Sequence, residues 1–177
     1  MSSPLSGFRR PKPGWLLRVG FKLPTLLYHG PMAAFLSTRC VMMLTSTGRK
    51  SGLPRTNGVS FMEMDGHYIS FSGWGVSSNW YRNVVANSQV TLQVGRRRIR
   101  ATAKPVLDPD RRQELMLRMQ VCSKDCGPPQ FIRPLMRLTK TFNYEREISM
   151  AVEHARELPV VEFVPHEPAE RNDQLRD

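Results

Sequence analysis

Hydrophobic and polar residues alternate most regularly between residues 89 and 105. Every second residue in two adjoining stretches is apolar, with a turn at Gly95-Arg96 between them: Val90, Leu92 and Val94, then Ile99, Ala101 and Ala103. A period of two places these side chains on one face of a strand. The pattern therefore predicts a β-hairpin that buries one face.

Three further stretches favour strands. Residues 40–46 form a short apolar run, as in a buried strand, and residues 159–164 form another. Two β-rich runs, 56–64 and 67–72, flank Asp65-Gly66. Asp-Gly between such runs indicates a tight hairpin, because both turn positions need a positive φ.

Helices are predicted on both sides of these strands. Residues 78–88 form a short helix with Ser77 or Ser78 as N-cap, and its inward residues are Trp80, Val84 and Val85. Asp108-Pro109 starts a helix that carries Leu115, Leu117, Met119 and Val121. Further helical candidates are residues 128–140 and 144–158.

The N-terminal region is basic and then amphipathic. Residues 1–13 indicate a flexible basic arm, and residues 14–29 one or two short helices. The amphipathic segment has three interpretations: core packing, a lid over a ligand site, or peripheral contact with a membrane surface. We expect one domain over residues 14–165 and a polar tail over residues 166–177.

Antiparallel strands with inserted helices predict an α+β, barrel-like domain. Strands and helices do not alternate regularly, which argues against a doubly wound sheet. The chain has 177 residues, enough for one domain with a sizeable core.

The net charge of the chain indicates which kind of partner it binds. Lys and Arg number 26 against 15 for Asp and Glu, a net charge of +11. An anionic partner follows: nucleic acid, an acidic membrane or a polyanionic cofactor. Arg96, Arg98 and Arg100 alternate with apolar residues as on a solvated strand face, and the aromatic signatures of RNA binding are absent, so we expect no nucleic-acid partner.

The cysteines and histidines predict no special chemistry. Three cysteines do not make a disulfide framework in a chain of this size, and the four histidines are scattered. We therefore expect reduced thiols, no metal site and a cytoplasmic protein. Neither a signal peptide nor an apolar run long enough for a bilayer is visible.

The loop "TSTGRKSGLPR", residues 45–55, is the first candidate for chemistry. It lies between two predicted strands, which excludes a nucleotide P-loop. Two interpretations stay open. It is a charged hairpin turn, or its successive backbone N–H groups form a concavity for a phosphate, reinforced by Arg49, Lys50 and Arg55.

The second candidate is Ser72-Gly73-Trp74-Gly75, followed by residues 79–83, "NWYRN". Glycines let a planar ligand approach the backbone, tryptophan offers a stacking face, and asparagine reads carbonyls and ring nitrogens. The alternative is that Trp80 and Tyr81 pack the barrel mouth. No nucleophile, base and acid share a motif, so catalytic residues stay unassigned and a bound cofactor would have to supply the chemistry.

Taken in order, "LTSTGRKSGLPRT", "SGWGVSSNWYRNVVANSQVTLQVG" and "RELPVVEFVP" resemble the deazaflavin-dependent nitroreductase family. The resemblance implies a mostly antiparallel split β-barrel of the flavin-reductase type, with an N-terminal helix and further helices around the barrel, and coenzyme F420 as hydride donor. It places the cofactor's phosphate and oligoglutamate tail on the loop, and the deazaflavin and ribityl chain on the Gly-rich turn and the helix. The implied binding residues are Thr47, Gly48, Arg49, Lys50, Ser51, Gly52, Pro54, Arg55, Asn57, Ser72, Gly73, Trp74, Ser78, Trp80 and Asn83.

The resemblance implies an oxidoreductase that transfers a hydride from reduced F420 to a hydrophobic acceptor. Quinones, enones, nitroaromatics and lipid-like molecules fit that description equally. The alternatives are an FMN-dependent reductase of the same fold and a non-catalytic cofactor or lipid carrier. Both a monomer and a homodimer are compatible with the sequence.

Overall fold

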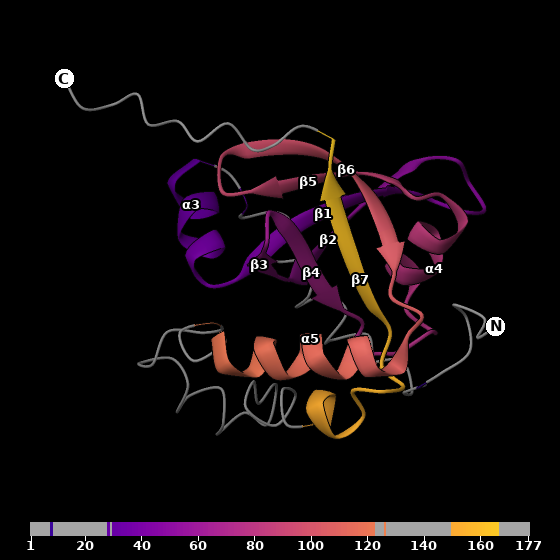
Figure 1. The fold of residues 1–177 in the computed structure, drawn as a ribbon. Coiled ribbons are helices and arrows are strands. Elements are labelled where there is room, and N and C mark those ends of the chain that lie inside the picture. Colours follow the sequence, from indigo (N-terminus) through magenta and orange to yellow (C-terminus); the bar gives the residue numbers. More distant parts are fainter. Residues whose placement is uncertain (1–7, 9–27, 29, 123–125, 127–149, 167–177) are drawn as a thin grey trace, which may run out of the picture.

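The computed structural model describes residues 8, 28, 30–122, 126 and 150–166 (Figure 1). Except for Phe8 and Tyr28, the predicted arm and the amphipathic segment 14–29 lie outside the described residues. So do the helical candidate at 128–140, the first part of the candidate at 144–158, and the tail from residue 167.

Seven strands form one sheet in the order β2-β1-β5-β6-β7-β4-β3, and every neighbouring pair is antiparallel. Figure 1 shows the sheet curling as a half-barrel. The strands are β1 Val41–Thr47, β2 Pro54–Ser60, β3 Met62–Met64, β4 His67–Phe71, β5 Gln89–Val94, β6 Arg97–Pro105 and β7 Val160–Pro165. The predicted α+β, antiparallel split-barrel class is confirmed.

The described residues form three helices beside the sheet, α3 Gly30–Thr38, α4 Asn79–Ala86 and α5 Pro109–Cys122, and a helical turn at residues 150–153. In Figure 1, α3 and α4 lie at opposite ends of the sheet, and α5 runs beneath it. The helix predicted to start at Asp108-Pro109 is confirmed. Leu115 and Met119 are buried against the sheet, whereas Leu117 and Val121 face outward. None of the described helices is long and apolar enough to cross a membrane.

The apolar alternation in the sequence becomes the inner face of the sheet. Val90, Leu92 and Val94 are buried, as are Ala101, opposite Val90, and Ala103 further along β6, and Ile99, opposite Leu92, is partly buried. They share one core cluster with residues of β1, β7 and α4. The predicted β5–β6 hairpin is confirmed, with Gly95 at φ +60° in its turn.

The Asp65-Gly66 turn joins β3 to β4, with Met64 paired to His67. Asp65 has φ +52° and Gly66 φ +77°. Both values fall in the left-handed region that a two-residue hairpin of this type needs. The predicted hairpin is therefore confirmed in its geometry as well as its position.

The prediction of reduced thiols is wrong for two of the three cysteines. Cys40, directly before β1, forms a disulfide with Cys126, after α5. Their Cα atoms lie 5.3 Å apart, although 86 positions separate them along the chain. Because the pairing depends on the tertiary fold, the spacing of the cysteines carried no sign of it.

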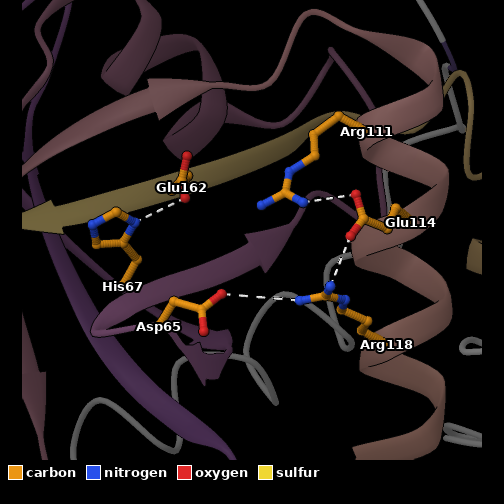
Figure 2. Close-up of polar contacts among 6 residues, drawn as sticks. All are labelled: Asp65, His67, Arg111, Glu114, Arg118 and Glu162. Atoms are coloured by element: carbon orange, nitrogen blue, oxygen red, sulfur yellow. Dashed lines mark hydrogen bonds and ion pairs between the residues drawn. The ribbon is translucent and has the colours of Figure 1, made fainter.

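A network of charged side chains joins α5 to the β3–β4 hairpin (Figure 2). Glu114 accepts from Arg111 at 2.7 Å and from Arg118 at 2.9 Å, and Arg118 also reaches Asp65 at 3.9 Å. On the sheet, His67 Nδ1 lies 2.9 Å from Glu162 Oε1. Among these pairs, Arg118–Asp65 alone links α5 to the hairpin, and exposed pairs of this kind contribute little each to stability.

We expect acid to remove the contribution of Glu114 to stability. The hydrogen bond from Arg111 holds the pKa of Glu114 below its ordinary value. A carboxyl group whose pKa is lower in the folded than in the unfolded protein stabilises the fold at pH values above its unfolded pKa, about 4.3. That stabilisation is lost as the pH falls through the lower, folded pKa. The difference in unfolding free energy between the parent and Glu114→Gln should therefore be present at about pH 7 and vanish near pH 3. Urea unfolding at several pH values measures it. Glu153→Gln, an exposed glutamate on the 150–153 helical turn, should show a smaller difference.

Candidate functional site

The first element of the candidate site is the β1–β2 loop, residues 48–53, closed by the pairing of Thr47 with Pro54. Gly48 donates its N–H to Leu53 O at 2.9 Å, and the carbonyl of Gly48 accepts from Ser51 and Gly52. A Cβ at Gly48 would lie 2.8 Å from Ser51 Oγ and 3.1 Å from Leu53 O. Gly52 has φ +66°. Both glycines are therefore required by the tight closure of this loop.

The loop's backbone amides point mostly into the protein. Those of Gly48, Ser51 and Gly52 donate to loop carbonyls, that of Leu53 to Ser51 Oγ, and that of Arg49 to Asn83 Oδ1. The sequence left open a phosphate concavity built of successive N–H groups. In this conformation these five N–H groups are already satisfied, so an anion would meet mainly the side chains of the loop.

Arg49 connects the loop to α4. Its backbone N–H and its Nη1 donate to Asn83 Oδ1 at 3.3 and 3.1 Å, and its Nη2 donates to Asn79 Oδ1 at 3.3 Å. Asn83 is buried. We call these three contacts the loop–helix bridge. They bring together two motifs that lie about thirty positions apart in the sequence, and they commit much of the Arg49 guanidinium to the protein itself.

Two other loop cations face solvent. Lys50 is exposed, and Arg55, at the start of β2, is exposed while donating to Ser51 Oγ at 3.4 Å. Within the described part of the chain, neither forms an ion pair. The sequence explains why: its first acidic residue is Glu63. Among the described residues, the loop is therefore cationic without an ion-pair partner, which suits an anionic ligand.

The Gly-rich turn at 72–75 leads into α4. Ser72 is fully buried, and its hydroxyl donates to Gly75 O at 2.8 Å, which leaves it turned into the protein. Gly75 has φ +62°, and Gly73 and Trp74 are half-buried. Of the residues predicted here, Gly73 and Trp74 remain accessible to a ligand, whereas Ser72 shapes the turn.

Helix α4 begins after Ser78, which has extended backbone angles and makes no side-chain cap bond. Ser78 and Trp80 are half-buried, and Trp80 packs partly on the core and edge-on against Tyr81. Tyr81 is buried, and burial raises the pKa of its hydroxyl while the charge of Arg112 opposes that rise. The predicted helix and N-cap position are confirmed. Tyr81 and Val84 form more of its inward face than Trp80 does.

The remaining predicted residues lie on β1 and β2. Thr47 ends β1 half-buried, Pro54 begins β2 exposed, and Asn57 is half-buried opposite Leu44. Asn57 therefore shares the inner-face register with Leu44, whereas Pro54 stands at the rim of the loop. The structure thus gathers the loop and α4 at one end of the sheet.

Sequence reasoning left one polar residue of α4, Asn79, out of the predicted binding residues. Asn79 and Asn83 are four positions apart, the spacing of neighbours on one helix face, and both accept from Arg49. The sequence alone therefore indicated that Asn79 and Asn83 lie on the same face of the helix.

Comparison with known proteins identifies the family. A family model described as F420H(2)-dependent quinone reductase matches residues 28–126, more than half of the chain. An F420H(2)-dependent quinone reductase of Mycobacterium tuberculosis (strain ATCC 25618 / H37Rv) is 36% identical over 74 residues, 39% of this chain and 50% of that protein. The chain thus spans about half the length of the curated relatives it matches.

Comparison with solved structures shows which known proteins have a similar fold. A conserved hypothetical protein of Mycobacterium tuberculosis is 11% identical with a TM-score of 0.50, over 78% of this chain and 81% of that one. An F420-H2 dependent reductase is 23% identical with a TM-score of 0.45, over 71% of this chain and 94% of that one. The first of these shows a shared fold, and the family model confirms the resemblance to deazaflavin-dependent reductases. The chain belongs to the F420H(2)-dependent quinone reductase family.

Proposed function

We propose that this protein is an oxidoreductase that uses reduced coenzyme F420 to reduce quinone-like acceptors. The observation that carries the proposal is the uncompensated cationic loop bridged to α4. Lys50 and Arg55 are exposed without ion-pair partners in the described chain, and the loop–helix bridge ties Arg49 of the same loop to α4, the helix that carries Trp80. Family membership supports the same cofactor and acceptor class.

The residues present fit this cofactor. Its anionic end would meet Lys50 and Arg55, which form no ion pair among the described residues, and Gly48 keeps the loop in a closure that a Cβ would disturb. Gly73, Trp74 and Trp80 would offer the half-buried surface for the ring system. Reduced F420, when bound, supplies a hydride to the acceptor.

The chain's own residues contribute binding and orientation. Lys50 and Arg55 would fix the charged end, and the tryptophans would exclude water from one side of the ring. The interior behind α4 is apolar, with Tyr81 and Val84 buried, so α4 is a rigid wall for whatever stacks on it. A proton donor remains unassigned.

Titrating the purified protein with oxidised F420, while following the coenzyme's fluorescence, tests the proposal. Saturable binding at micromolar concentrations is expected, and binding of FMN in its place would favour an FMN-dependent reductase. A panel of quinones, enones and nitroaromatics with reduced F420 then separates a reductase from a carrier. Binding without reduction of any acceptor would contradict the enzyme proposal.

We expect Lys50→Ala to weaken F420 binding about tenfold, and Arg98→Ala to leave it unchanged. Losing one charge-assisted contact costs about 1.5–3 kcal/mol, and about 1.4 kcal/mol is tenfold in affinity. Arg98 is an equally exposed cation on β6, paired in register with Gln93. The fluorescence titration measures both variants. Equal losses would show that general charge, rather than the loop, holds the cofactor.

A further inference from the structure

We propose that Phe8 is a positioning residue of the F420 site, which holds the Gly-rich turn at 72–75 and with it the surface that receives the deazaflavin ring. This inference rests on the proposed function and adds a residue that none of the sequence motifs contains. Phe8 lies in the basic N-terminal arm, outside residues 28–126 that the family model matches. It is half-buried between two segments that lie far from it in the sequence.

The backbone of Phe8 joins these two segments. Its N–H donates to Glu157 O at 3.1 Å, in the turn before β7, and its carbonyl accepts from the Val76 N–H at 3.0 Å. Val76 follows Gly75 directly and is 3% exposed. Phe8 therefore lies between the two turns as a residue of a middle strand lies between its neighbours, with one hydrogen bond to each side.

The side chain of Phe8 anchors this arrangement. Its ring stacks on His154, with the ring centroids 4.8 Å apart and an angle of 27° between the ring planes. The ring also packs against the core cluster that contains Leu115 and Met119 of α5. Two backbone hydrogen bonds gain little more than the entropy lost in ordering one residue, so the ring supplies the remaining attraction. Removing the ring should therefore release the backbone bonds as well.

The turn that Phe8 holds carries part of the proposed ring surface. Two of its backbone N–H groups donate outside the turn, that of Ser72 to Pro159 O at 2.9 Å and that of Val76 to Phe8 O. Trp74 lies between these two points of attachment and is half-buried. Without Phe8, the side of the turn that leads toward α4 loses its attachment. Binding the ring must then also order Trp74 and its neighbours, which lowers the affinity.

Hydrogen exchange of Phe8→Ala, measured without cofactor, tests the first step. We expect the Val76 N–H to exchange about tenfold faster than in the parent, because its acceptor is no longer held in place. The N–H of Ala103, which donates to Ser88 O at 2.8 Å, reports on the sheet and should accelerate less. Phe8→Tyr keeps the aromatic stack and should restore the exchange rate of the parent.

Fluorescence titration of the same variants tests the second step with two probes. One is F420, and the other is the deazaflavin–ribityl fragment that lacks both phosphate and tail. Phe8→Ala should bind both probes more weakly by about the same factor, fivefold to tenfold, because the turn lies at the ring end of the site. The dependence of F420 binding on salt should stay that of the parent, since no charge is removed.

The matched control is Phe35→Ala, which removes an exposed phenyl ring from α3, at the opposite end of the sheet from α4 (Figure 1). It should bind both probes as the parent does. Unchanged exchange at Val76 in Phe8→Ala would overturn the inference, and so would equal acceleration at Val76 and Ala103, because the change then weakens the whole fold. Faster exchange at Val76 with parental affinity for both probes would overturn it while the proposed function stands. If the parent binds neither probe, the proposed function fails and the positioning role falls with it.

Discussion

Replacing Asn83 with leucine is expected to lower F420 affinity more than tenfold and the free energy of unfolding by about 1–3 kcal/mol. Asn83 is buried, and its Oδ1 accepts from both the backbone N–H and the guanidinium of Arg49. Leucine removes both contacts and leaves a loop N–H without its acceptor. The loop then loses its fixed position relative to α4. Binding an anion to Lys50 must therefore also order the loop, which lowers the affinity.

Urea unfolding and the fluorescence titration measure the two effects on the same samples. Asn83→Asp keeps an oxygen acceptor for Arg49 and should recover most of the lost stability. Lys50→Ala should weaken binding with stability within about 0.5 kcal/mol of the parent, because Lys50 is exposed. Unchanged binding in Asn83→Leu would show that the loop keeps its place without the bridge.

Most of the fold could be predicted from local pattern. The β5–β6 hairpin followed from the alternation of Val90, Leu92 and Val94, because a half-buried strand requires that period. Asp65-Gly66 specified its turn through the positive φ values it allows. The order of the strands in the sheet was less accessible, since β7 pairs with β4 and β6 across long stretches of chain.

The site was predictable as two motifs and not as one assembly. The loop and α4 carry recognisable residue types, but the bridge between Arg49 and Asn83 spans 34 positions and depends on the curl of the sheet. The inward direction of the loop amides and the burial of Ser72 are likewise properties of the closed backbone. Cys40–Cys126 was missed for the same reason.

Arg112→Leu is expected to destabilise the protein by about 3 kcal/mol, because three hydrogen bonds from a buried charged group are lost together. Arg112 is 7% exposed. It donates from Nε to Val106 O at 2.8 Å, from Nη2 to Leu107 O at 2.7 Å and from Nη1 to Arg156 O at 2.9 Å. These carbonyls belong to the chain entering α5 and to the turn before β7, so one side chain fastens both to the helix.

The adjacent Arg111 supplies the matched control, since its side chain is 41% exposed and pairs with Glu114 on the same helix. Arg111→Leu should cost less than about 1 kcal/mol in urea unfolding. Arg112→Lys should recover little, because one ammonium cannot reproduce the spread of the guanidinium donors toward three carbonyls. The charge of Arg112 also opposes the rise that burial causes in the pKa of Tyr81 on α4. If both leucine variants lower the free energy of unfolding by the same amount, the buried hydrogen bonds of Arg112 contribute no more to stability than the exposed pair of Arg111 does. If Arg112→Leu alone unfolds at lower urea, the attachment of α5 to the segment that precedes it and to the turn before β7 depends on Arg112, which the sequence shows only as one of two adjacent arginines.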